Sequence, residues 1–279
     1  MTLAQLQAWA GDELRNAGVA SSDHEVKLLL MAATGLDKAG LISNAYQTVR
    51  DEVRESFLTY VKRRVQREPV HRILGRREFH SLELDLNAAT LEPRDDTECL
   101  VELVLAQLPD RNAPLRVLDL GTGTGAVALA LLRELPQATA TATDLEPSAL
   151  QMAISNAKKN DLADRFSTLQ SDWFEHVTGR YDLIVSNPPY IATDVLPLLE
   201  PEVVRFDPAL ALDGGADGLD AYRQILANGR DYLVEEGILA LEIGHDQRHC
   251  VSQLASANGW KVTQTARDLA GCDRALCLR

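Results

Sequence analysis

The stretch Arg116-Val-Leu-Asp-Leu-Gly-Thr-Gly-Thr-Gly125 decides the fold, because an apolar strand pattern runs directly into a glycine-rich turn. A helical apolar pattern, Ala126–Glu134, follows it. Glycines let the backbone turn sharply and let a ligand lie against it without clashing with a Cβ atom. The spacing G-x-G-x-G differs from the G-x-G-x-x-G of dinucleotide-binding folds, and no Gly-Lys-Ser/Thr of a phosphate-binding loop follows. The stretch therefore predicts a ligand-binding turn in an α/β fold.

Acidic side chains follow the next two expected strands. Asp144 closes the strand Thr139–Thr143, and a carboxylate at that place accepts hydrogen bonds from both ribose hydroxyls of a nucleoside. Asp172 can meet an exocyclic amine and Trp173 can cover a base. The set predicts a nucleoside bound across the strand ends, with an unusual group where a phosphate would lie. The alternative is a turn that serves packing only, with Asp144 as a helix N-cap.

The segment Tyr181-Asp-Leu-Ile-Val-Ser-Asn-Pro-Pro-Tyr190 is the most specific signal in the sequence. Pro188 and Pro189 stiffen the backbone just past a buried strand, where open α/β sheets bind ligands. The Asn187 side-chain oxygen and the Pro188 carbonyl oxygen can accept both N–H bonds of a planar amide, and Tyr190 adds an aromatic face. Held in this way, the nitrogen lone pair points at an electrophile. The alternative is a turn whose prolines only stop the strand.

Strand and helix patterns alternate on both sides of these motifs. The expected strands are Arg116–Leu120, Thr139–Thr143, Arg165–Leu169, Tyr181–Ser186, Gly237–Ile243, Trp260–Thr265 and Arg274–Leu278. The expected helices are Thr97–Gln107, Ala126–Glu134, Pro147–Asn160 and Leu219–Val234. Alternating β and α segments with apolar strands predict a parallel sheet covered by helices on both faces.

The first third of the chain has a different pattern, which is helical throughout. Valine or phenylalanine recurs every four residues from Val49 to Val65, as on the buried face of one long helix. Pro69 and Gly75 break that pattern, and His80–Asn87 alternates polar and apolar residues as a strand does. We expect a helical bundle over 1–70, a hairpin linker over 71–92 and the α/β domain over 93–279.

Composition excludes several classes of protein. The chain has 279 residues, 46% of them hydrophobic and 25% charged, which is typical of a folded protein with a sizeable core. Its apolar runs are too short for a membrane span, and its first residues lack the pattern of a signal peptide. Four cysteines without C-x-x-C spacing disfavour a disulfide framework and a zinc site. We expect a cytoplasmic protein without a metal.

Charge is distributed unevenly along the chain. Residues 1–80 carry 12 Lys and Arg against 10 Asp and Glu, whereas the remainder carries 16 against 31. Binding to a phosphate backbone needs clustered cations, so we expect no direct binding to DNA. One basic cluster stands out, namely Lys62, Arg63, Arg64, Arg67, Arg72, Arg76 and Arg77. It is either a solvated face or a docking surface for a protein partner.

Several motifs together resemble one family, the PrmC or HemK family of release factor glutamine methyltransferases. They are Glu68-Pro69, Gly75-Arg-Arg-Glu-Phe79, Pro93-Arg94, Thr97-Glu98, Leu118–Gly125, Ser186–Ile191, Val204–Leu219 and Arg267–Gly271. The resemblance covers nearly the full length. It implies a Rossmann-like class I S-adenosylmethionine-dependent methyltransferase fold with a small N-terminal helical bundle that docks the substrate.

The resemblance also implies an activity and its residues. The expected reaction is N5-methylation of the glutamine in the Gly-Gly-Gln motif of class I peptide chain release factors, with S-adenosylmethionine as cofactor. The residues that it implies for the substrate amide are Asn187, Pro188, Pro189 and Tyr190. The residues that it implies for the cofactor are Gly121, Thr122, Gly123, Thr124, Gly125, Asp144, Asp172, Trp173 and Asn187.

Alternatives and one departure accompany this interpretation. A ribosomal protein L3 glutamine methyltransferase or a nucleic-acid amino-methyltransferase would use the same Asn-Pro-Pro-Tyr motif. A non-catalytic binding module is a further alternative, and we favour a monomer. The family's usual Pro-Arg-Pro-Asp-Thr-Glu reads Pro93-Arg-Asp-Asp-Thr-Glu98 here, preceded by the acid Glu92. We expect this change to loosen the loop, and no chemical step is assigned to Arg94 or Glu98.

Overall fold

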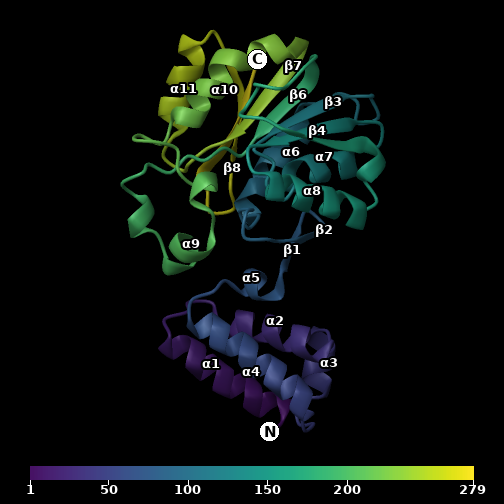
Figure 1. Ribbon diagram of the computed structural model, residues 1–279, viewed down its shortest axis with the longest axis vertical. Coiled ribbons are helices and arrows are strands. Elements are labelled where there is room, and N and C mark those ends of the chain that lie inside the picture. Colours follow the sequence, from purple (N-terminus) through teal and green to yellow (C-terminus); the bar gives the residue numbers. More distant parts are fainter. The chain divides into compact units, whose positions relative to one another are not determined.

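The computed structural model describes residues 1–279, and the chain divides into two compact units. The first unit contains Met1–Gly75 together with Glu200–Phe206. The second contains Arg76–Leu199 and Asp207–Arg279. Figure 1 shows helices alone in the first unit and a helix-covered sheet in the second. Neither unit contains a helix with the length and apolar character that a membrane span requires.

The first unit is a helical bundle around one apolar core. Its helices are α1 (Leu3–Asn16), α2 (Ser22–Thr34), α3 (Lys38–Ser43), α4 (Asp51–Val65), α5 (Val70–Leu74) and α9 (Pro201–Phe206). The α1 helix begins at a capping box in which Thr2 and Gln5 exchange hydrogen bonds. Four-residue spacing buries Phe57 and Val61 of α4 against α1 and α2. The long helix predicted up to Val65 is thus present.

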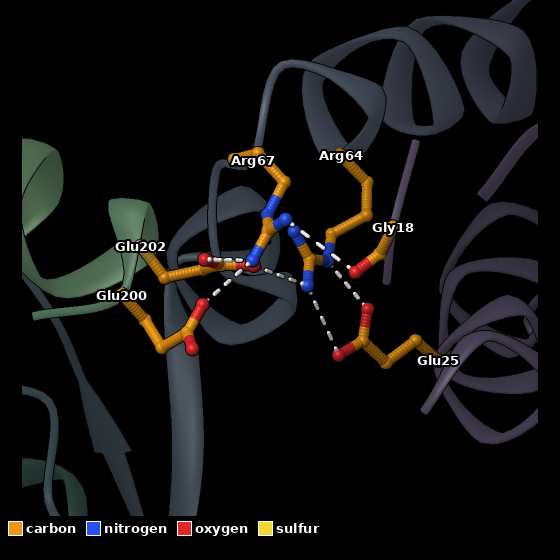
Figure 2. Close-up of polar contacts among 6 residues, drawn as sticks. All are labelled: Gly18, Glu25, Arg64, Arg67, Glu200 and Glu202. Atoms are coloured by element: carbon orange, nitrogen blue, oxygen red, sulfur yellow. Dashed lines mark hydrogen bonds and ion pairs between the residues drawn. The ribbon is translucent and has the colours of Figure 1, made fainter. Parts of the chain in front are cut away.

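An ion-pair cluster holds α9 in the first unit (Figure 2). We call Glu25, Arg64, Arg67, Glu200 and Glu202 the arginine cluster. Arg64 pairs with Glu25 and donates from Nη2 to Glu202 Oε1 at 3.0 Å. Arg67 donates to Glu202 Oε2 at 2.7 Å and to Glu200 at 3.2 Å. A segment far along the sequence therefore completes the N-terminal unit.

Other cations of the predicted basic cluster also form ion pairs within the chain. Arg63 pairs with Glu68, and Arg76 pairs with Glu83 at 3.2 Å. Arg77 pairs with two acids at once. Since most of the cluster is neutralised internally, its charge favours the interpretation of a paired structural face over that of a free docking surface.

The second unit is built on a seven-stranded sheet with the order β5-β4-β3-β6-β7-β9-β8. Its strands are β3 (Arg116–Leu120), β4 (Thr139–Asp144), β5 (Phe166–Gln170), β6 (Tyr181–Ser186), β7 (Leu233–Glu242), β8 (Val262–Arg267) and β9 (Asp273–Leu278). The first five strands of the order are parallel, as predicted, whereas β9 is antiparallel to both β7 and β8. The sheet is therefore mixed at its C-terminal edge.

Helices cover both faces of this sheet (Figure 1). They are α6 (Glu98–Gln107), α7 (Ala126–Glu134), α8 (Pro147–Lys159), α10 (Asp220–Asn228) and α11 (Arg248–Ala257). Strand alternation separates the two cores: Leu183 and Val185 face α6 and α7, whereas Ile184 faces α10 and α11. The hairpin β1 (Arg76–Phe79) and β2 (Leu82–Asp85) belongs to the same unit.

The helix predicted over Leu219–Val234 is too long. The α10 helix ends at Asn228, a 3₁₀ turn spans Gly229–Tyr232, and β7 already begins at Leu233. The apolar side chain of Leu233 is buried in the sheet core, so packing in the strand prevails over the helical spacing of the local sequence.

Candidate functional site

A cavity of about 470 Å³ opens in the second unit beyond the carboxyl ends of its parallel strands. Register brings these ends level, because Leu120 lies beside both Thr143 and Ser186, and Asp144 lies beside Gln170. The lining residues that the sequence predicted are Gly121, Thr122, Gly123, Thr124, Asp144, Asp172, Trp173, Asn187 and Pro189. Three other predicted residues, Gly125, Pro188 and Tyr190, do not line it.

The glycine turn between β3 and α7 has two roles. Gly121 and Gly123 adopt positive φ values of 71° and 55°, and a Cβ atom on either would meet nothing within 4 Å. Both thus face open space in the cavity wall. Gly125 instead caps α7, and a Cβ there would approach Leu129 to 3.1 Å and Ala153 to 3.3 Å. Two glycines leave room for a ligand, whereas the third permits close helix packing.

Asp144 is fixed by the glycine turn and by the start of α8. Its Oδ2 accepts the Gly123 N–H at 2.9 Å, and its Oδ1 accepts the Glu146 N–H at 3.0 Å. Burial raises the pKa of Asp144, while these backbone N–H groups lower it. Each oxygen has lone pairs left over, so the carboxylate can accept further hydrogen bonds from a diol in the cavity.

Asp119 is a cavity residue that the sequence interpretation missed. It lies in β3 and is only 2% exposed, and the Thr122 hydroxyl donates to its Oδ2 at 2.7 Å. Burial raises the pKa of Asp119 to about 7. Through Thr122 it holds the glycine turn, and it adds an acid to the cavity wall. An acid inside an apolar strand pattern is the signal that could have found it.

Asn187 lies in the cavity wall directly after β6. Its Nδ2 donates to Thr97 Oγ1 at 3.2 Å, and Thr97 is 3% exposed. Within the chain, neither Asn187 Oδ1 nor the Pro188 carbonyl oxygen accepts a hydrogen bond. The Ser186 hydroxyl ties this end of β6 to β3 by donating to Leu120 O at 2.7 Å. The motif therefore presents two oxygen acceptors on a rigid strand end.

Tyr190 is tied into the protein at both of its ends. Its hydroxyl lies 3.3 Å from Glu242 Oε1, and its carbonyl accepts Gln247 Nε2 at 2.9 Å. Burial and the neighbouring Glu242 raise the pKa of the Tyr190 phenol. The ring packs against the core on the α10 and α11 face of the sheet. These contacts hold the Asn-Pro-Pro-Tyr segment. Sequence patterns did not indicate Glu242 or Gln247 as contributors, and they gave Thr97 only as part of a family motif.

The atypical loop before α6 is anchored, so the expected loosening is wrong. Glu92 is 2% exposed and pairs with Arg77. Arg94 lines the cavity and donates to the buried Asp207 at 2.5 Å. Glu98 accepts a backbone N–H from the β-hairpin at 2.8 Å. Ion pairing compensates for the buried acid at position 92, and Arg94 and Glu98 have structural partners.

Comparisons with known proteins place these features in a family. A family described as "PrmC N-terminal domain" matches residues 5–75, and one described as "Methyltransferase small domain" matches residues 96–197. The ribosomal protein L11 methylase of Lactobacillus delbrueckii subsp. bulgaricus is similar in fold, with a TM-score of 0.50 and 22% identity over 68% of this chain and 81% of that one. The predicted class I S-adenosylmethionine-dependent methyltransferase fold is confirmed.

Two relatives match almost from end to end. The release factor glutamine methyltransferase of Agrobacterium fabrum is 45% identical over 273 residues, which cover 97% of this chain and 94% of the relative. That of Moorella thermoacetica is 42% identical over 276 residues, which cover 98% and 97%. The chain belongs to the release factor glutamine methyltransferase family, also called PrmC or HemK.

Proposed function

We propose that this chain transfers the methyl group of S-adenosylmethionine to the side-chain amide nitrogen of the glutamine in the Gly-Gly-Gln motif of class I peptide chain release factors. Membership of the family supports this proposal. The observation that carries the proposal is the hydrogen bonding of the Asn187 side-chain amide. Its Nδ2 is bound to Thr97, so its Oδ1 is left for a substrate amide in the same cavity that holds the glycine turn and Asp144.

The cavity fits S-adenosylmethionine in size and in chemistry. Its volume of about 470 Å³ is typical of small-molecule sites. Open space at Gly121 and Gly123 would accept the methionine part, and the Asp144 carboxylate would accept both ribose hydroxyls. Asp172 and Trp173 line the same cavity and would hold the adenine. These residues supply the acceptors and the stacking surface that a nucleoside needs.

The substrate amide would lie against the strand end after β6. Asn187 Oδ1 and the Pro188 carbonyl oxygen would each accept one N–H bond, which directs the nitrogen lone pair along a single line. The bound cofactor supplies an electrophilic methyl group on a sulfonium. The two oxygens would stabilise the positive charge that develops on nitrogen as the N–C bond forms and the sulfonium S–C bond breaks, which leaves a neutral thioether. The alkylated nitrogen then loses one proton to solvent, so no strong base is required.

We assign docking of the release factor to the first unit. Its surface carries two large apolar side chains, Ile42 at 78% and Tyr46 at 91% exposure, at the end of α3 and just beyond it. Exposed apolar side chains are typical of protein contacts, whereas the arginine cluster is already occupied. Replacing Ile42 and Tyr46 by serine should raise KM for the folded release factor and leave KM for a Gly-Gly-Gln peptide unchanged.

We further propose that the protein acts as a monomer in the cytoplasm and binds no DNA directly. The charge of residues 81–279, with 16 Lys and Arg against 31 Asp and Glu, supports the last point. Sedimentation of the purified protein tests the oligomeric state. Retention on DNA at low salt would contradict the proposal.

The decisive test is transfer of a labelled methyl group. The purified protein is incubated with labelled S-adenosylmethionine and, in parallel, with release factor, a Gln-to-Ala release factor, ribosomal protein L3 and DNA. We expect label on the release factor alone, and mass spectrometry should place the methyl group on the Gly-Gly-Gln peptide. Label on L3 or DNA but not on the release factor would replace this proposal with one of the alternatives.

A further inference from the structure

We propose that Thr97 and Glu242 are positioning residues that fix which end of the Asn187 side-chain amide faces the cavity. This inference rests on the proposed function, because it concerns the acceptor that would hold the substrate amide. Neither residue is assigned a role by the Asn-Pro-Pro-Tyr motif. Both come from elements distant in sequence, Thr97 from the turn before α6 and Glu242 from the end of β7.

An asparagine side chain needs such a device because its two ends are similar in size. With Oδ1 toward the cavity it can accept an N–H of the substrate amide, and with Nδ2 there it would present a second donor and repel it. In the structure Nδ2 donates to Thr97 Oγ1 at 3.2 Å. This contact selects the productive end, provided that Thr97 acts only as an acceptor toward Asn187.

Glu242 makes Thr97 an acceptor. A threonine hydroxyl has one proton, so it can donate one hydrogen bond. Toward every other neighbour it can act only as an acceptor. Glu242 is 2% exposed, and its Oε2 is buried and makes no hydrogen bond in the structure, so we infer that this oxygen is the acceptor toward which the Thr97 proton is directed. The neighbouring Thr97 hydroxyl accordingly lowers the pKa of the Glu242 carboxyl. With its proton directed at Glu242, Thr97 offers Asn187 only lone pairs.

The Glu242 carboxyl also accepts a hydrogen bond from the tyrosine of the motif. The Tyr190 hydroxyl lies 3.3 Å from Glu242 Oε1, so one acid orients both the first and the last residue of Asn187–Tyr190. Neither Glu242 nor Tyr190 lines the cavity. Their action on the reaction therefore passes through the geometry of the motif.

The protonation state of Glu242 should control this arrangement. Burial raises the pKa of Glu242 to about 7, while Thr97, Arg274 and Tyr190 lower it. The other ionisable groups that act on it or on its partners are Arg94, Asp96, Cys99, Tyr222 and Asp268. The carboxylate accepts from Thr97. The protonated carboxyl can instead donate to Thr97, which frees the threonine proton for Asn187 Oδ1 and permits the flipped amide.

Kinetics of isosteric variants test the proposal. Glu242→Gln and Thr97→Val should each lower kcat by about tenfold or more, with KM and cofactor affinity within about twofold of the parent, and Thr97→Ser should restore most of the activity. The parent's kcat should rise as pH increases through about 7, and Glu242→Gln should remove that rise. The matched control is Glu235→Gln, an exposed acid on the same strand.

A second readout does not depend on turnover. The Asn187 side-chain NH₂ resonances, identified by their loss in Asn187→Asp, should shift with an apparent pKa near 7 in the parent and not in Glu242→Gln. If the parent methylates no glutamine, the proposed function fails while this titration still tests the inference. An Asn187 resonance insensitive to pH and to Glu242→Gln would overturn it, as would full activity of Thr97→Val. Should Glu242→Gln fail to fold, the pair Thr97→Val and Thr97→Ser decides.

Discussion

Acids with low exposure are held in opposite ways in the two units of this protein. In the arginine cluster, Glu202 is paired with both Arg64 and Arg67, and against the effect of burial these hydrogen bonds lower its pKa. In the second unit, the cavity residue Asp119 and the positioning residue Glu242 are each 2% exposed and receive hydroxyl hydrogen bonds. Burial raises the pKa of both to about 7.

The difference separates acids that hold the fold from acids that serve the site. A guanidinium neutralises a carboxylate and fixes its position. Such a pair contributes to the fold, and its carboxylate is not free to bind a ligand or a proton. Hydroxyl and N–H donors orient a carboxylate without neutralising it, so it stays responsive to a ligand or to pH. Perturbed acids in a cavity wall are a signature of functional sites.

The largest effect is expected where the site offers an oxygen to the substrate. Asn187→Ala should lower kcat by about 10²-fold or more, because one positioned acceptor in the transition state is lost. Cofactor affinity, measured by calorimetry, should change little. Asn112→Ala, in an exposed loop, is the control. An unchanged kcat would favour a non-catalytic binding module.

Breaking the arginine cluster should cost stability and leave the site intact. Arg64→Ala removes the shared cation of Glu25 and Glu202, whose side chains are 15% and 18% exposed. We expect a loss of about 2 kcal/mol in the free energy of unfolding, reduced from the fully buried case by this solvent contact. Denaturant unfolding measures it, with Arg50→Ala as the exposed control. A loss of cofactor affinity instead would contradict the separation.

Removing the ribose acceptor should weaken the cofactor and spare the reaction. Asp144→Ala should raise the Kd for S-adenosylmethionine by about tenfold, because the lost hydrogen bonds involve a part of the ligand that does not react. At saturating cofactor, kcat should stay within about threefold of the parent. Asp164→Ala, exposed on the surface, serves as the control. Unchanged affinity would show that Asp144 does not bind the ribose.

The smallest effect concerns pH and has opposite signs in the two regions. Since the pKa of Glu242 rises from 4.5 to about 7 on folding, the folded state holds an extra proton between these values, and stability falls as pH rises through that window. Glu242→Gln should make this fall shallower, and unfolding titrations of parent and variant measure the difference. The lowered pKa of Glu202 acts oppositely, and its stabilisation is lost as pH falls below 4.5. Parallel pH profiles for parent and Glu242→Gln would contradict the assignment.

Local patterns predicted the centre of the fold and the surface of the site. The bounds of β3, α7 and β6 follow from continuous apolar segments with glycine or proline at their ends. Residues that follow β3 and β6, which are neighbouring strands in register, line the cavity. Patterns failed where long-range packing decides, as at Leu233, which is a strand residue in a helical context.

Side-chain partners distant in sequence could not be predicted. The Thr97 and Asn187 contact spans 90 positions, and the Arg67 and Glu202 pair spans 135. No periodicity records such pairs, because they depend on how sheet order and loops bring the chain together. The interpretation of Glu92 failed for the same reason, since its partner Arg77 lies on another element.

The segment Glu200–Phe206 limits how modular this enzyme can be. Because it belongs to the N-terminal unit yet lies between two stretches of the other, the polypeptide passes from one unit to the other three times. A chain shortened to begin at residue 76 would keep Glu202 but lose both arginines that bind it. The N-terminal unit therefore cannot be exchanged by itself: a graft or a fusion must carry residues 200–206 with it, or leave Glu202 without its two arginines.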